Sequence, residues 1–118
     1  PVSTLDLFPT ACAATGTRPP KKKYDGVNLL PFLTGKSDED PHRYLFWRIG
    51  DRHALRKGDW KILRQRNKTW SLFSLKSDIG ETRNLADTMP VQTGELIKLW
   101  ETENSAMIDP VWTPRRKK

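Results

Sequence analysis

The spacing of apolar residues changes at about residue 43, and this change is the strongest constraint on the fold. From Tyr44 onward, apolar side chains alternate with polar ones, and turn-forming residues interrupt the pattern at short intervals. A period of two residues is typical of β-strands. We therefore predict four short strands separated by turns. Their ranges are 44–49, 53–57, 60–66 and 69–75.

One turn in this region predicts how two of the strands pair. Gly58 and Asp59 suit a two-residue hairpin loop, because glycine adopts a positive φ without strain. The pairs that follow are Lys57 with Trp60, Leu55 with Ile62 and, on the opposite face, Ala54 with Leu63. Both faces of the sheet thus carry apolar side chains, so each face needs a cover.

The chain offers one cover, a helix predicted over residues 90–107. Proline is favoured in the first turn of a helix, and Pro90 stands there. The partly apolar stripe of this helix consists of Leu96, Leu99, Trp100 and Glu103. No second cover is evident. The other sheet face is therefore predicted to be an exposed apolar patch, whose natural cover is a neighbouring domain.

The N-terminal segment is predicted to begin with a helix over residues 3–14. Ser3 can cap it, Asp6 favours its positive end, and Gly16 can end it. Pro9 should kink it. Its apolar stripe, which we expect to be buried, consists of Leu5, Phe8 and Cys12. A short apolar element over residues 25–33 should also be buried.

The net charge of +7 comes from two short runs of basic residues. These runs are residues 21–23 and 115–118. Of the 21 basic residues, seven lie in the runs, and the remaining 14 equal the 14 acidic residues. Such runs are usually solvated, so we predict no nucleic-acid partner. Binding of sulfated or other anionic polymers through these segments stays open.

Composition also excludes several kinds of site. Cys12 is the only cysteine, so there is no internal disulfide and no cysteine-rich zinc site. His42 and His53 have no partner at metal-ligand spacing, so no metal site is predicted. The apolar runs are shorter than the roughly 18 residues of a membrane helix, so no membrane segment is expected.

Three motifs, in this order, resemble the end of arylsulfatase-type sulfatases. The first is residues 3–10 followed by Gly16 and residues 25–29, and the second is residues 54–61. The third is residues 72–75 followed by Asp78, Gly80, Glu81 and residues 84–86. Together they cover nearly the whole chain. The resemblance implies an alkaline-phosphatase-like α/β enzyme that hydrolyses sulfate esters and that is periplasmic, extracellular or lysosomal.

The resemblance also implies where the catalytic groups lie. In this family a cysteine converted to formylglycine attacks sulfur, and a calcium ion polarises the sulfate. Both belong to a large N-terminal catalytic domain, so no catalytic residue and no metal ligand is expected in this chain. Cys12 opens a run that approximates the modified-cysteine motif, but Gly16 stands where the family has arginine. We interpret Cys12 as a packing residue, and Asp78 and Glu81 as turn residues.

The segment from Arg48 to His53 is the candidate edge of the substrate pocket, because the C-terminal subdomain of sulfatases lies beside the active-site mouth. Arg48 can offer two parallel donors to a sulfate or carboxylate, and His53 could donate to a substrate oxygen. The alternative is that Arg48 pairs with Asp51 or Asp59 at the surface. The five tryptophans (47, 60, 70, 100 and 112) are interpreted mainly as core or interface residues rather than as a sugar-stacking platform.

We therefore predict an α+β fragment in which a four-stranded antiparallel sheet packs on a C-terminal helix and follows a linking helix. Residues 1–42 would link from the missing catalytic domain, and residues 43–118 would form the C-terminal subdomain with its basic tail. The predicted function is that of the C-terminal part of a sulfatase acting on a sulfated small molecule or saccharide, inactive by itself. The alternative is a stand-alone binding module for anionic polymers.

Overall fold

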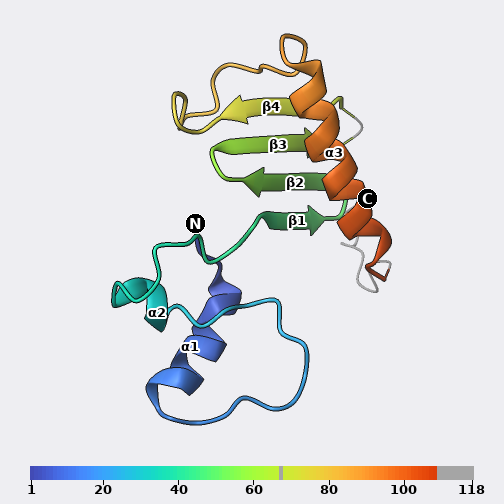
Figure 1. Ribbon diagram of the computed structural model, residues 1–118. Helices are drawn as coiled ribbons and strands as arrows, with labels where there is room; N and C mark the ends of the chain where they lie inside the picture. Colours follow the sequence, from blue (N-terminus) through green and yellow to red (C-terminus); the bar gives the residue numbers. More distant parts are fainter. Residues whose placement is uncertain (67, 109–118) are drawn as a thin grey trace, which may run out of the picture. The chain divides into compact units, whose positions relative to one another are not determined.

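The computed structural model describes residues 1–66 and 68–108, and the chain divides into two compact units (Figure 1). The N-terminal unit is Pro1–Arg43. It holds the 3-10 helix η1 (Thr4–Asp6) and the helices α1 (Leu7–Ala14) and α2 (Leu30–Leu33). The sheet unit begins at Tyr44. Its elements are β1 (Leu45–Ile49), β2 (Arg52–Lys57), β3 (Trp60–Gln65), β4 (Ser71–Ser74) and α3 (Pro90–Ser105). The basic run at residues 115–118 and Trp112 lie outside the described residues.

The four strands form one antiparallel sheet in the order β1-β2-β3-β4, as predicted. Lys57 lies opposite Trp60, and Leu55 lies opposite Ile62, so the predicted register is confirmed. The turn depends on Gly58, which has a φ of 57°. Gly50 has the same φ in the turn between β1 and β2. Both hairpins therefore place glycine where an L side chain would be strained.

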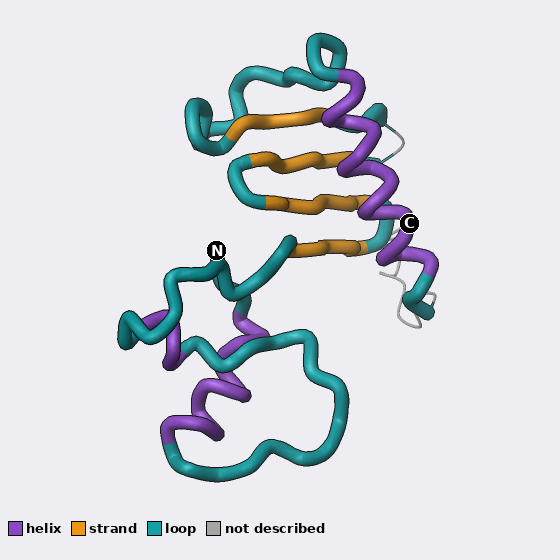
Figure 2. The backbone as a smooth tube through the Cα atoms, viewed as in Figure 1, coloured by secondary structure: helices purple, strands orange, loops and turns teal. Residues whose placement is uncertain are grey.

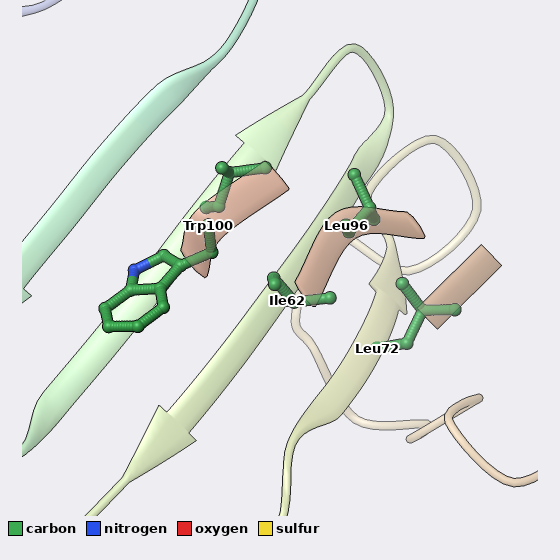
Figure 3. Packing of buried hydrophobic residues seen from close by; sticks show 5 residues of the cluster. Ile62, Leu72, Leu96 and Trp100 are labelled. Atoms are coloured by element: carbon green, nitrogen blue, oxygen red, sulfur yellow. The ribbon is translucent and has the colours of Figure 1, made fainter. Parts of the chain in front are cut away.

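Helix α3 crosses one face of the sheet and encloses the hydrophobic core (Figures 1 and 3). The core cluster consists of Leu55, Ile62, Leu72, Leu96 and Trp100, each at most 3% exposed. The three strand residues share one face, since Leu55 pairs with Ile62 and Ile62 pairs with Leu72. Burial of each such side chain stabilises the fold by about 1.5–3 kcal/mol. The predicted packing of the sheet on the C-terminal helix is confirmed, and the helix ends at Ser105 rather than at residue 107.

Within the described part of the sheet unit, no helix covers the opposite sheet face (Figure 1). By register this face carries Leu45, Trp47, Ile49, Ala54, Leu63 and Phe73. Trp47 and Ile49 of β1 are 42% and 70% exposed, whereas Ala54 and Phe73 are buried. The exposed apolar patch that we predicted is therefore present, but it is confined to β1.

After β4 the chain turns back along the outer edge of the sheet. The Asp78 carboxylate closes the turn by accepting hydrogen bonds from the Thr82 hydroxyl and the Arg83 N–H. The side chain of Asn84 then accepts the N–H of Leu72, and the carbonyl of Leu72 accepts the N–H of Leu85. These bonds position the segment that leads into α3. The interpretation of Asp78 as a turn residue is confirmed.

The N-terminal unit consists largely of loops (Figure 2) and is held together by polar contacts. Asp6 is completely buried. Its carboxylate accepts the backbone N–H of Ser3 at 2.7 Å and of Val27 at 2.9 Å, and it pairs with Nε2 of His42 at 2.9 Å. The hydroxyl of Thr10 accepts the N–H of Leu29 at 2.9 Å. Side chains of the first motif thus hold the backbone of residues 27–29.

Gly26 allows this close packing. A Cβ atom at this position would lie 2.1 Å from the carbonyl oxygen of Leu5, far inside van der Waals contact. The backbone of residue 26 therefore approaches η1 as closely as only glycine allows. This explains the second half of the first motif in structural terms.

Three expectations for this unit were wrong: the buried stripe, the buried element over residues 25–33 and the kink at Pro9. No residue of α1 is buried, and Leu5 and Phe8 are 58% and 48% exposed, so the apolar stripe does not lie in a core. No residue of 25–33, which include α2, is fully buried either. Pro9 lies in the first turn of α1, because the preceding turn is the 3-10 helix η1. Its missing N–H is tolerated there. The predicted stop at Gly16 is confirmed, since Gly16 has a φ of 68°.

Among the described residues, none of the helices combines the length and the apolar character that crossing a membrane requires.

Candidate functional site

Arg48, one of the two predicted substrate contacts, fastens β1 to the C-terminal end of α3. Its guanidinium donates to Oδ1 of Asn104, 2.8 Å away, and to the carbonyl oxygen of Ile108. Among residues 1–66 and 68–108 the ion pairs are Asp6–His42 and Lys61–Glu81. The pairing of Arg48 with Asp51 or Asp59, which we considered as the alternative, is therefore wrong.

His53, the other predicted contact, is also engaged inside the chain. Its ring stacks on Trp100 with the ring centroids 4.4 Å apart. Its Nδ1 accepts hydrogen bonds from Nε and Nη2 of Arg64, at 3.2 and 2.7 Å. Because Nδ1 is an acceptor, the proton lies on Nε2, which donates to the carbonyl of Gly50 at 3.2 Å.

The charge state of His53 follows from these surroundings. Burial lowers the pKa of His53, and the positive charges of Arg64 and Arg48 lower it further. The hydrogen bond to Gly50 and the charge of Asp51 act in the opposite direction and do not reverse the shift. His53 is thus a neutral imidazole at physiological pH, with both nitrogens occupied by residues of this unit.

Arg64 completes the cluster and was missed by sequence reasoning. Its guanidinium carbon lies 4.8 Å from the ring centroid of Trp70 and 5.7 Å from that of Trp100. A signal for its position was available, because the register set by Gly58 places Arg64 directly opposite His53. We call His53, Arg64, Trp70 and Trp100 the aromatic–arginine cluster.

A hollow of about 230 Å³ lies beside this cluster. It is lined by Asp51, His53, Arg64, Arg66 and Lys68. Three of these side chains are cations and one is a carboxylate, so the hollow carries an excess of positive charge. Arg48 is not among its lining residues. The structure thus brings His53 and the β1–β2 turn together with basic residues of the β3–β4 connection.

The other residues singled out in the sequence have structural partners. Glu81 pairs with Lys61 of β3, and His42 pairs with Asp6 across 36 positions of sequence. Cys12 is half-buried in α1. Within the described residues, no group of three or more His, Cys, Asp or Glu side chains is placed to hold a metal ion.

Comparison with known proteins shows which proteins this chain is similar to. No family model matches the chain. An uncharacterized sulfatase of Schizosaccharomyces pombe is 28% identical in an alignment 125 residues long. The alignment covers 92% of this chain and 23% of that protein. Human steryl-sulfatase is 40% identical over 47 residues, which cover 39% of this chain and 8% of that enzyme. The chain therefore spans less than a quarter of the length of these relatives.

Solved structures also match most of this chain. The crystal structure of Ps i-CgsB matches 95% of this chain with a TM-score of 0.78 and 27% identity, over 26% of that chain. The phosphonate monoester hydrolase of Agrobacterium radiobacter matches 86% of this chain with a TM-score of 0.59 and 25% identity, over 25% of that chain. Both matches are partial with respect to the solved protein.

The motifs, the antiparallel sheet packed on a helix, and the relatives that match over nearly the whole chain agree with one another. In sequence and in fold, the chain is similar to the C-terminal portion of sulfatases.

Proposed function

We propose that the intact protein hydrolyses sulfate esters and that this chain is its C-terminal subdomain, inactive by itself. The strongest support is the match of 92% of this chain to 23% of a sulfatase. A stand-alone module for anionic polymers is less favoured, because the curated relatives matched over this segment are sulfatases.

The cofactors of such an enzyme would be held outside this chain. Calcium takes six or more oxygen ligands, and the described residues offer no suitable cluster. Cys12 does not fit the formylglycine precursor, since glycine replaces the expected arginine at Gly16. We propose that an N-terminal catalytic domain of the same protein supplies both groups. Calcium bound there would polarise the sulfate ester. A periplasmic, extracellular or lysosomal location is part of the same proposal.

A sulfated saccharide is the substrate class that we propose. The solved protein Ps i-CgsB, which is 27% identical to this chain, was crystallised in complex with k-i-k-neocarrahexaose. The segment from Arg48 to His53 would border the substrate pocket. Arg48 and His53 would act there as positioning residues, because Arg48 holds β1 to α3 and His53 holds the carbonyl of Gly50. The exposed turn between them would then face the substrate.

The first test is an activity assay on two proteins. The full-length protein encoded by the parent gene should hydrolyse a small aryl sulfate, whereas the purified 118-residue chain with calcium should not exceed a heat-treated control. Turnover by the 118-residue chain would contradict the proposal that this chain is inactive without the N-terminal catalytic domain. A full-length protein that cleaves a phosphonate monoester but no sulfate ester would overturn the sulfatase assignment.

The second test addresses the substrate edge. In the full-length enzyme, Arg48→Ala and His53→Ala should each raise KM for a sulfated oligosaccharide several-fold and leave KM for a small aryl sulfate nearly unchanged. The small substrate does not reach the edge of the pocket. Equal losses on both substrates, or no loss on either, would show that the segment serves only the fold.

A further inference from the structure

We infer that the hollow lined by Asp51, His53, Arg64, Arg66 and Lys68 binds a single oxyanion, the sulfate ester group of a saccharide. This inference rests on the proposed function only for the choice of a sulfated sugar as ligand. The observations that carry it are the unpaired charge of the hollow, the fixed position of Arg64 and the geometry of the β3–β4 connection.

The hollow holds positive charge that the described chain does not neutralise. Arg64, Arg66 and Lys68 line it together with one carboxylate, that of Asp51. Within residues 1–66 and 68–108 none of these four side chains forms an ion pair. His53 adds no charge, because both of its nitrogens are satisfied as a neutral ring. A monovalent or divalent anion would find complementary charge here.

Arg64 is held in place before any ligand arrives. Its guanidinium lies over the rings of Trp70 and Trp100 and donates from Nε and Nη2 to Nδ1 of His53. The hydrogen bonds recorded for Arg64 in the described chain do not use Nη1. A preordered guanidinium loses little entropy when it binds an oxyanion, and its bonds to that anion are charge-assisted.

The connection between β3 and β4 directs the other two cations toward the same hollow. The N–H of Lys68 donates to the carbonyl of Gln65 at 3.2 Å and closes a turn. Arg66 within this turn has a φ of 52°, in the left-handed region that non-glycine residues seldom adopt. Such a conformation is unfavourable for an arginine and is found preferentially at binding sites.

The size of the hollow favours one charged group over an extended chain. Its volume of about 230 Å³ is below the range of roughly 300–1,000 Å³ that is typical of pockets for whole drug-sized ligands. Nucleic-acid binding, by contrast, depends on several phosphates spread along a surface. A sulfate group on one sugar residue therefore matches the hollow better than a polynucleotide does.

The test is an NMR titration of the full 118-residue chain with galactose 6-sulfate, using galactose as the uncharged comparison. Galactose 6-sulfate should shift the amide signals of residues 64–66 and 68 in a saturable manner, and galactose should not. The double variant Arg66→Gln/Lys68→Gln should weaken binding at least about tenfold, since it removes two charge-assisted contacts. The matched control Lys76→Gln/Lys98→Gln removes the same charge at exposed positions outside the hollow and should change affinity less than about twofold.

Both double variants should have the same thermal unfolding midpoint as the parent chain. If Arg66→Gln/Lys68→Gln unfolds at a lower temperature, the single variant Lys68→Gln provides an independent measurement.

Three results would overturn the inference. The first is no saturable binding of galactose 6-sulfate, and the second is equal weakening by both double variants. The third is that a single-stranded DNA decamer binds more tightly than galactose 6-sulfate and that Arg66→Gln/Lys68→Gln does not weaken its binding. The titration requires no catalysis. Its failure is therefore distinct from a failure of the sulfatase assay.

Discussion

The two units of this chain are held together by different forces. In the sheet unit the most completely buried side chains are apolar, and they form one cluster between the strands and α3. In residues 1–43, all of which the structure describes, the one fully buried residue is Asp6, which carries a carboxylate. Around it, large apolar side chains such as Leu7 and Leu33 are more than 60% exposed.

This difference explains what kind of change each unit should tolerate. Apolar burial is non-directional, so a core accepts substitutions that keep shape and volume. Hydrogen bonds and close backbone contacts are directional, and a buried polar group without its partner is costly. The N-terminal unit should therefore be sensitive to single-atom changes at Asp6 and Gly26. The sheet unit should respond mainly to lost volume.

The largest effect is expected for Trp100→Ala in the sheet unit. The indole stacks on Phe46 and His53 and is 3% exposed, so its removal leaves a cavity. The free energy of unfolding should fall by about 4 kcal/mol, measured by urea denaturation with circular dichroism. Val91→Ala on the same helix is the control, because Val91 is 76% exposed. A loss of less than about 1 kcal/mol for Trp100→Ala would show that the apolar cluster does not dominate this unit.

The next effect is expected for Gly26→Ala in the N-terminal unit. Its Cβ atom would meet backbone atoms of Leu5, which cannot rotate away. Destabilisation of about 3 kcal/mol is expected for such overpacking, seen as faster hydrogen exchange at the amides of Val27 and Leu29.

Gly94→Ala is the matched comparison for this glycine. Gly94 lies within α3, and a Cβ atom there would meet nothing within 4 Å beyond its chain neighbours and the backbone of its own helix. Alanine should stabilise the helix by about 0.5–1 kcal/mol through its higher helix propensity. The two glycine substitutions should thus have opposite signs. The same sign for both would contradict the contrast between the units.

A smaller effect is expected for Asp6→Asn, which keeps the size of the side chain but loses its charge and one of its two acceptor oxygens. Ser3 and Val27 donate to different oxygens of Asp6, so one of these two N–H groups would lose its acceptor, and the pair with His42 would lose its negative charge. The N-terminal unit should be destabilised by about 2 kcal/mol. Asp25→Asn changes an exposed carboxylate nearby and should cost less than about 0.5 kcal/mol. Hydrogen exchange at Val27 would report both changes.

Asp6 also predicts the pH dependence of this unit. Burial raises the pKa of Asp6, but the hydrogen bonds from Ser3, His42 and Val27 outweigh burial and leave the pKa below its ordinary value. The unfolded chain therefore binds the proton more readily, and stability is lost as pH falls below about 4. The protection of the Val27 amide, relative to the intrinsic exchange rate at each pH, should fall over that range in the parent chain but not in Asp6→Asn. A pH-independent parent chain would contradict the assigned role.

The parts of the fold that follow from local pattern could be predicted from the sequence. Alternation gave four strands, Gly58 set the register, and Pro90 marked the start of α3. The same register, continued by four residues, would have placed Arg64 opposite His53. The stacking of Trp70 and Trp100 around Arg64 was not accessible, because it depends on how α3 and the β3–β4 connection pack in three dimensions.

The N-terminal unit was predicted less well for a physical reason. Its apolar spacing indicated a buried stripe, whereas the structure buries a carboxylate there. The partner of that carboxylate, His42, lies 36 positions away. No periodicity links two such residues. Long-range polar pairs of this kind become visible only when the fold is known.

The return of the chain along β4 has a consequence for self-association. An edge strand with free N–H and C=O groups is a template on which another molecule can add a strand. Here the outward-facing amide and carbonyl of Leu72 are occupied by Asn84 and Leu85 of the same molecule. This internal pairing blocks intermolecular sheet growth at the middle of β4. Asn84 thus occupies an amide of the edge strand as well as connecting the sheet to α3.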